Sequence, residues 1–243
     1  MNIIILTKND RVDETTYSID DNRATHIIKI LKSKVGDVLE IGLLNDSIGK
    51  SEVVDLNDGI VKLKILELSK YTTPQYCIDL ILALPRPQTL KKVLATIATM
   101  GINNLYLIRS EKVEKSYFHS PLLEEKNYSK YLLEGLSQGK RVDLPKVTIH
   151  KKFKQFFENS FLQKNETSVK LLAHPDEDIF LNKKMLNNNN NIILAIGPEG
   201  GWNDFEINFM AEKGFQKFKL SKNILRVETA VTAALAQVEL LDK

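Results

Sequence analysis

The sequence predicts an α/β protein in two parts, a small β-rich domain over residues 1–72 and a larger α/β domain over residues 73–243. In the first part, short apolar runs are separated by turns rich in Gly, Asn and Asp, which is typical of a small β-barrel. In the second part, apolar runs alternate with segments of helical periodicity. That alternation favours a mostly parallel sheet with helices on both faces.

The first part is predicted to contain four strands and one helix. The helix covers residues 23–32 and carries Ile27, Ile28 and Leu31 as its apolar residues. Turns rich in Gly and Asp separate the strands. These strands are predicted at residues 3–6, 38–43, 51–56 and 60–66.

In the second part, which begins near Pro74, five strands and four helices are predicted. Asn203 followed by Glu206 has the pattern of a helix-capping box, and Gly214 is expected to end that helix. The asparagine run at residues 187–191 is predicted to be a polar linker. The strands are expected at residues 78–84, 105–108, 169–173, 192–196 and 218–220, and the helices at residues 89–100, 121–136, 203–213 and 228–241.

Composition excludes several classes of protein. The net charge of +3, from 34 basic and 31 acidic side chains, is too small for an overall basic field to argue for RNA binding. The only cysteine, Cys77, excludes a disulfide framework, and its apolar strand predicts a buried small side chain. No apolar run is long enough to span a membrane, and residues 1–6 are too short for a signal peptide. We therefore expect a soluble, cytoplasmic protein without membrane partners.

Two loops carry most of the chemical information. One, at residues 196–202, follows an apolar strand and contains Gly197, Pro198, Gly200 and Gly201; the other follows the strand at residues 218–220. Loops at neighbouring strand ends of an open α/β sheet form a ligand cleft, and glycines let the backbone approach the ligand. Neither G-x-x-x-x-G-K-[ST] nor G-x-G-x-x-G occurs, so the sequence contains neither of these phosphate-binding patterns.

The same loops resemble a known family. Gly-Pro-Glu-Gly-Gly at residues 197–201, the following Glu206, and Asn-Ile-Leu-Arg-Val-Glu-Thr-Ala at residues 223–230 resemble the signature of the bacterial 16S ribosomal RNA (uracil-N3)-methyltransferases, members of the SPOUT superfamily. The resemblance implies a PUA-like N-terminal β-barrel, a C-terminal trefoil knot and a homodimer. It further implies that S-adenosylmethionine methylates N3 of one uridine, at position 1498 of 16S rRNA, in the 30S subunit, without a metal.

The donor is expected to lie between the two loops. The adenine of the donor needs an apolar slot in which backbone groups form hydrogen bonds with the edge of the base. The apolar walls of this slot can be formed by Ile196, Leu220, Ile224 and Leu225. His174 ends the preceding strand and is expected on a third side. The complete set of predicted cofactor-binding residues is His174, Leu194, Ile196, Gly197, Pro198, Glu199, Gly200, Gly201, Leu220, Ser221, Ile224, Leu225, Arg226, Glu228, Thr229 and Ala230. Four scattered histidines without cysteine or acid spacing predict no metal site.

The acceptor requires proton removal from uracil N3 and stabilisation of the charge that spreads to the neighbouring carbonyl oxygens. Glu199 is the candidate proton acceptor, and Arg226 is the candidate hydrogen-bond donor to the base or to a phosphate. Glu228 and Thr229 are either catalytic or first-turn stabilisers of the last helix. Trp202 either stacks on a base or packs at the start of a helix.

Local basic clusters, rather than net charge, indicate where RNA binds. They supply the predicted RNA contacts Lys29, Lys32, Arg86, Lys91, Arg141 and Lys152. Ala98-Thr99-Met100 and Ser137 depart from the residues usual in the family, and these departures concern the RNA target more than the donor site. Three alternatives stay open: ribose 2′-O-methylation of rRNA or tRNA, a non-catalytic RNA-binding protein of ribosome assembly, and a small-molecule nucleotide enzyme.

Overall fold

The computed structural model describes residues 2–72, 77–161, 165–186 and 191–241. The chain divides into two compact units. Unit 1 comprises Met1–Thr73 and Leu133–Leu144, and unit 2 comprises Pro74–Leu132 and Pro145–Lys243. The predicted boundary at residues 72 and 73 adjoins a segment, residues 73–76, that lies outside the described residues. No described helix has the length and apolar character needed to cross a membrane.

Unit 1 is built on a five-stranded sheet. Its order is β1-β3-β4-β5-β2, with β1 parallel to β3 and the other neighbours antiparallel. Alternate side chains pack into one core, in which Ile27, Ile41 and Leu63 are fully buried. The strands are β1 (Ile4–Leu6), β2 (Thr16–Ile19), β3 (Val38–Leu43), β4 (Ser47–Asn57) and β5 (Ile60–Lys70). Strand β2 was not predicted.

The predicted helix at residues 23–32 is a short α-helix, α1 (Asn22–Thr25), that continues as a wider π-helical segment, η2 (His26–Leu31). Asp21 caps its start, and Lys32 ends it in the left-handed conformation with φ 54°. The wider turn rotates the helix face, so Ile27 is buried but Leu31 is 40% exposed. Of the three apolar residues of this helix, Ile27 and Ile28 pack against the core and Leu31 does not.

Residues 133–144 belong to unit 1 because they bond to its sheet. The backbone carbonyl of Ser137 accepts a hydrogen bond from the Ile3 amide at 3.2 Å, and that of Val142 accepts one from the Asn45 amide at 2.7 Å. These residues include the second half of α3 (Glu125–Gly139). One helix therefore contributes residues to both units.

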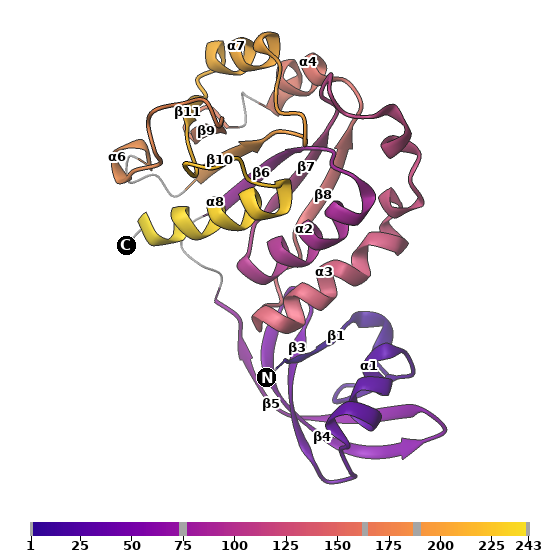
Figure 1. Ribbon diagram of the computed structural model, residues 1–243. Helices are drawn as coiled ribbons and strands as arrows, with labels where there is room; N and C mark the ends of the chain where they lie inside the picture. The colour runs from indigo at the N-terminus through magenta and orange to yellow at the C-terminus, as the bar shows by residue number, and fades with distance from the viewer. Residues whose placement is uncertain (1, 73–76, 162–164, 187–190, 242–243) are drawn as a thin grey trace. The chain divides into compact units, whose positions relative to one another are not determined.

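Unit 2 contains a six-stranded sheet of order β11-β9-β10-β6-β7-β8 in which every neighbouring pair is parallel, as predicted (Figure 1). The central strand β10 is buried from Ile192 through Ile196, which is expected when both faces of a sheet are covered. The strands are β6 (Cys77–Ala83), β7 (Asn104–Ile108), β8 (Lys146–His150), β9 (Val169–Ala173), β10 (Asn191–Ile196) and β11 (Gln216–Phe218). Strand β8 was not predicted.

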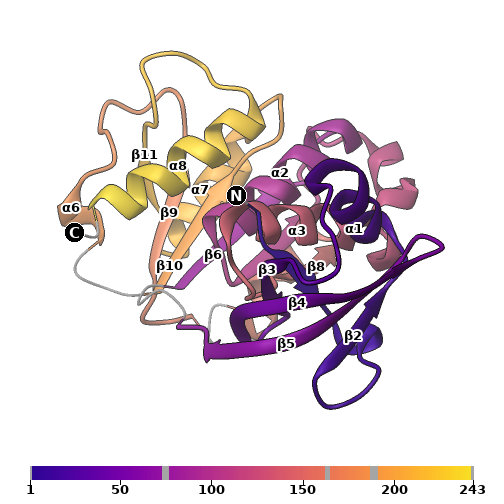
Figure 2. The same cartoon turned by 90° about the horizontal axis from the view of Figure 1, so that it is seen from below.

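The four predicted helices of unit 2 are present. α2 and α8 lie side by side against the sheet (Figures 1 and 2). The predicted helix at residues 121–136 begins instead as a 3-10 turn, η4 (Pro121–Leu123), before α3. The helical segments of unit 2 are α2 (Pro87–Met100), η3 (Lys115–His119), α4 (Phe153–Phe156), η5 (Phe157–Phe161), α6 (Lys183–Leu186), α7 (Asp204–Glu212) and α8 (Val227–Leu241).

Two local predictions are confirmed and one is wrong. Asn203 and Glu206 form the expected capping box at the start of α7, and Gly214 follows its end with φ 87°. Cys77 is exposed rather than buried, because it lies at the first position of β6 before the strand enters the core. The predicted linker at residues 187–191 falls largely outside the described residues.

Candidate functional site

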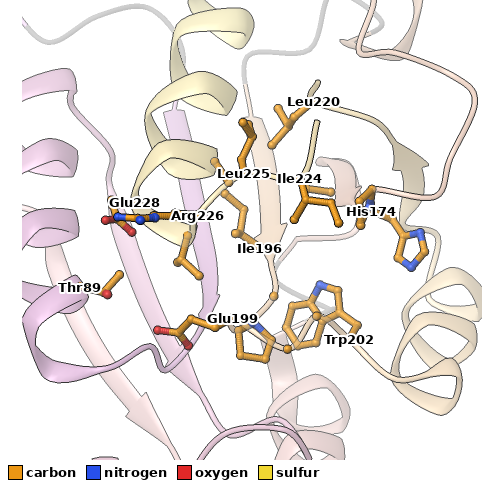
Figure 3. Close-up of a pocket in the computed structure, with 18 of the residues that line it drawn as sticks. Thr89, His174, Ile196, Glu199, Trp202, Leu220, Ile224, Leu225, Arg226 and Glu228 are labelled. Carbon is orange, nitrogen blue, oxygen red and sulfur yellow. The ribbon is translucent and has the colours of Figure 1, made fainter. Parts of the chain in front are cut away.

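A cavity of about 830 Å³ lies in unit 2 where β6, β9 and β10 end (Figure 3). The loop after β10 supplies Gly197 to Trp202, the segment after β11 supplies Leu220, Ser221 and the residues from Asn223 to Arg226, and the start of α2 supplies Thr89. The carboxyl ends of parallel strands are where open α/β sheets bind ligands. The two glycine-containing loops singled out in the sequence therefore meet at one cavity.

Of the sixteen predicted cofactor-binding residues, all but two line this cavity. Leu194 is fully buried inside β10, and Thr229 is exposed on α8 outside the cavity. The predicted residues that line it are His174, Ile196, Gly197, Pro198, Glu199, Gly200, Gly201, Leu220, Ser221, Ile224, Leu225, Arg226, Glu228 and Ala230.

The loop at residues 197–201 is held in one shape by its neighbours. A side chain added at Gly197 would place its Cβ 3.2 Å from the Trp202 ring, and Gly201 adopts a positive φ of 68°. The ammonium of Lys112 donates to the carbonyl oxygens of Gly200 at 3.0 Å and Trp202 at 3.4 Å. Both glycines are needed for backbone reasons, one for space and the other for conformation.

Glu206 fastens this loop to the segment that follows β7. Its side chain is only 2% exposed. The carboxylate accepts hydrogen bonds from the Asn203 amide at 3.0 Å, the Glu111 amide at 2.8 Å and the Ser110 hydroxyl at 3.2 Å. A buried carboxylate with several donors stabilises a structure, while its removal leaves those donors without a partner.

We expect Glu206→Ala to lower the free energy of unfolding by ~2 kcal/mol, because the buried Ser110 hydroxyl and two partly buried backbone amides lose their acceptor. Chemical denaturation of the purified protein measures this change. Glu212→Ala is the matched control, since Glu212 is an exposed residue of the same helix. Equal stability of the two variants would show that the buried network is not needed for folding.

Charged residues gather at the rim of the cavity. Glu199 accepts a hydrogen bond from the Arg86 amide at 3.1 Å, and Lys92 lies 3.4 Å from the Glu228 carboxylate. A hydrogen bond from its own backbone amide, together with Lys92 and the charge of Arg226, holds the pKa of Glu228 below its ordinary value against the opposing effect of burial. Arg226 itself is exposed. The rim thus presents cations beside two acidic side chains.

Two polar atoms in the cavity wall have no hydrogen-bond partner within the described protein. They are Nδ1 of His174 and Nε1 of Trp202. The indole nitrogen lies on the edge of Trp202 nearer Ile224 in Figure 3, and the Trp202 side chain is 5% exposed. Buried polar atoms are normally paired, so these two atoms in residues that line the cavity are exceptions within the described chain. The burial of Trp202 also supports packing at the helix start rather than stacking on a base.

Several cavity residues were not predicted as part of the donor site. They come from the start of α2, the segment after β7, the end of β9 and the start of α8. The first two of these segments are far away in the sequence from the glycine-rich loop. Arg86-Pro87 before an amphipathic helix was the only local signal for the former. The residues missed are Gln88, Thr89, Lys92, Lys112, Ala173, Asp176 and Val227.

The predicted RNA contacts are placed differently from one another. Lys29 and Lys32 are exposed in unit 1, whereas Arg86 lines the cavity rim of unit 2. The ammonium of Lys91 lies 5.8 Å from the ring centre of Tyr131. Lys152 lines a second cavity in unit 2.

Arg141 is not an accessible cation in unit 1. Its side chain is 12% exposed and forms an ion pair with Asp143, so the structure does not support the predicted contact with phosphate. Metal ligation is limited as well. No three His, Cys, Asp or Glu residues of the described chain are grouped so that they could hold a metal ion.

The chain belongs to the family of the RNA methyltransferase domain, which it matches over residues 72–239. It is 29% identical to ribosomal RNA small subunit methyltransferase E 1 of Borreliella burgdorferi, over 96% of this chain and 95% of that protein. It is 25% identical to ribosomal RNA small subunit methyltransferase E of Treponema pallidum, over 98% of this chain and 90% of that protein.

Solved structures share the fold over almost the whole chain. The ribosomal RNA small subunit methyltransferase E of Neisseria gonorrhoeae, determined with bound S-adenosyl methionine, has a TM-score of 0.79 at 18% identity and covers 98% of both chains. A probable rRNA-methyltransferase of Porphyromonas gingivalis has a TM-score of 0.79 at 17% identity, covering 100% of this chain and 98% of that one. The architecture of unit 1 and unit 2 is therefore that of known rRNA methyltransferase structures.

Proposed function

We propose that this protein transfers a methyl group from S-adenosylmethionine to N3 of one uridine in 16S rRNA. The observation that carries the proposal is the 830 Å³ cavity built from the loops at residues 197–201 and 223–230. Relatives named ribosomal RNA small subunit methyltransferase E align with this chain over nearly its whole length. Position 1498, named by the family resemblance, is the proposed target.

The cavity fits the methyl donor by its size and its chemistry. Its volume of about 830 Å³ suits a nucleoside with an amino-acid arm. Ile196, Leu220 and Leu225 offer apolar contacts to the adenine, and the glycine loop offers backbone donors and acceptors. When bound, the donor supplies an activated methyl group on a sulfonium.

The rim residues can serve the acceptor base. Glu199 lies at the cavity with its side chain 35% exposed, where it can take the N3 proton of uracil. Arg226 can donate to a uracil carbonyl oxygen while negative charge builds up there. The ion pair of Lys92 with Glu228 places one positive and one negative charge beside Arg226. These roles for Glu199 and Arg226 deepen the proposal and are tested separately below.

We further propose that the protein acts as a cytoplasmic homodimer, with unit 1 as a PUA-like barrel and the C-terminal segment of unit 2 threaded as a trefoil knot. The family resemblance supports these features, and the curled five-stranded sheet of unit 1 suits a small barrel. Lys29 and Lys32 are exposed in unit 1 and are proposed RNA contacts of that unit.

The assembled 30S subunit is the proposed substrate, because each basic group is weak by itself and useful affinity requires several phosphates at once. We expect much higher activity on 30S particles that lack the modification than on a short hairpin carrying the target. Activity should also fall steeply as salt is added. Methyl transfer from radiolabelled donor, measured over a salt series on both substrates, gives the comparison. Similar rates on both would argue against a substrate of many contacts.

Nucleoside analysis of the product decides between the two methyltransferase alternatives. Digestion of the methylated rRNA should yield N3-methyluridine. Detection of a 2′-O-methylated nucleoside would instead identify the ribose 2′-oxygen as the acceptor, and the proposed donor site would still stand. Absence of transfer, together with absence of donor binding by calorimetry, would leave the non-catalytic RNA-binding alternative.

A further inference from the structure

A second cavity, of about 580 Å³, lies in unit 2 along the edge strand β8. β7, β8 and the segment α4–η5 form its walls. Its lining combines aromatic rings, amide side chains and lysines. None of these residues lines the first cavity. This mixture of side chains differs from that of an ordinary hydrophobic core and is typical of a ligand site.

Aromatic rings form the inner wall of this second cavity. Tyr106 lies 5.0 Å from Phe161 between ring centres, and His150 lies 4.7 Å from Phe156. Phe156 and Phe161 are buried, whereas Tyr106 and His150 are half-buried and leave part of their surface open. Burial lowers the pKa of His150, so its ring is neutral at pH 7. Flat neutral rings at the wall of a cavity are suited to contact with a nucleobase.

Lysines form the rim. Lys146, Lys151 and Lys152 are exposed, and none of them forms an ion pair with another described residue. Among the described residues, none that lines this cavity is acidic. Asp79 lies near its edge but accepts hydrogen bonds from Asn104 at 2.6 Å and Tyr106 at 3.3 Å. The rim is therefore cationic and complementary to phosphate groups.

One aromatic contact connects the segment beside the second cavity with a residue that lines the first. Lys152 lines the second cavity, and the next residue, Phe153, has its ring centre 6.3 Å from that of Trp202. Trp202 lines the first cavity. A residue beside the second cavity therefore packs against a residue that lines the first, and both cavities belong to unit 2.

We propose that the second cavity binds one unpaired nucleotide of the RNA substrate while the target uridine occupies the first. The base lies against the wall of Tyr106 and His150, and its phosphates lie at Lys146, Lys151 and Lys152. Aromatic stacking with lysine contacts is the usual mode of binding single-stranded RNA. This inference rests on the proposed function in that it takes RNA as the substrate.

Two variants of the full-length protein test the proposal. Lys146→Ala/Lys151→Ala/Lys152→Ala removes the rim charges, and Thr148→Phe fills the cavity from the middle of β8. Lys184→Ala, at an exposed lysine of the same unit outside both cavities, is the control. Affinity is measured for 30S subunits lacking the modification, and calorimetry measures the affinity for S-adenosylmethionine in parallel. Thermal denaturation verifies that each variant is folded.

We expect the triple variant to bind 30S subunits about tenfold more weakly and to lower the salt slope of log affinity by about two. Thr148→Phe should weaken binding about fivefold, and both variants should bind the methyl donor as the parent protein does. If the triple variant loses affinity while folded Thr148→Phe does not, the lysines act as a plain charged surface and the nucleotide pocket is refuted. The pocket is also refuted if both variants match Lys184→Ala, or if adenosine or uridine monophosphate binds there while RNA affinity stays unchanged. Failure of the parent protein to bind either 30S subunits or the donor would instead overturn the proposed function.

Discussion

Gly197→Val is expected to reduce affinity for S-adenosylmethionine by about a hundredfold or more, ~2.7 kcal/mol. The physical reason is packing behind the loop. A Cβ at residue 197 would lie 3.2 Å from two atoms of the Trp202 ring and 3.3 Å from the Trp202 amide, and valine adds two further methyl groups. Trp202 is 5% exposed, so the added side chain has to displace either the indole ring or the loop that carries residue 197.

Calorimetric titration of the donor into parent and variant protein measures the loss. Gly200→Ala is the control in the same loop, because its Cβ would meet only the flexible side chain of Lys112, at 3.3 Å. That control should bind the donor within about threefold of the parent, on the order of 0.7 kcal/mol. Unchanged binding by Gly197→Val would show that the ligand does not depend on this loop. Absence of heat with the parent protein would remove the proposed donor site altogether.

Arg226→Lys is expected to lower turnover by about a hundredfold while leaving the affinity for S-adenosylmethionine within about threefold. Arg226 lines the cavity, yet its side chain is exposed rather than packed into the wall, so it can face the acceptor. Lysine keeps the positive charge but cannot reproduce the planar guanidinium fork. The charge effect on neighbouring Glu228 should therefore survive in the variant.

Single-turnover methyl transfer and donor calorimetry, performed on the same preparation, separate the two effects. Lys222→Ala serves as the control, since Lys222 is exposed in the same loop and does not line the cavity. Equal losses of donor affinity and turnover in Arg226→Lys would assign Arg226 to donor binding. Full turnover by Arg226→Lys would show that methyl transfer requires the positive charge at this position and not the planar guanidinium group.

The sequence by itself determined the features that depend on local chemistry. Alternation of apolar strands with amphipathic helices predicted the parallel sheet of unit 2, because a strand buried on both faces reads as a continuous apolar run. Asn203 and Glu206 predicted the start of α7, since a capping box needs only residues three apart. The resemblance of residues 197–201 and 223–230 to a family signature indicated an RNA methyltransferase, and the family match agrees.

Only the tertiary structure decided which distant residues join the site. Lys92 and Lys112 line the cavity because parallel strands bring their segments to one edge of the sheet, and no local pattern marks them. Burial of Arg141 against Asp143 likewise follows from the packing of residues 133–144 with unit 1. Strands β2 and β8 were missed because polar residues interrupt their apolar positions, and pairing with a neighbouring strand stabilises them. Local chemistry is encoded within a few residues, whereas these contacts depend on chain segments that only folding brings together.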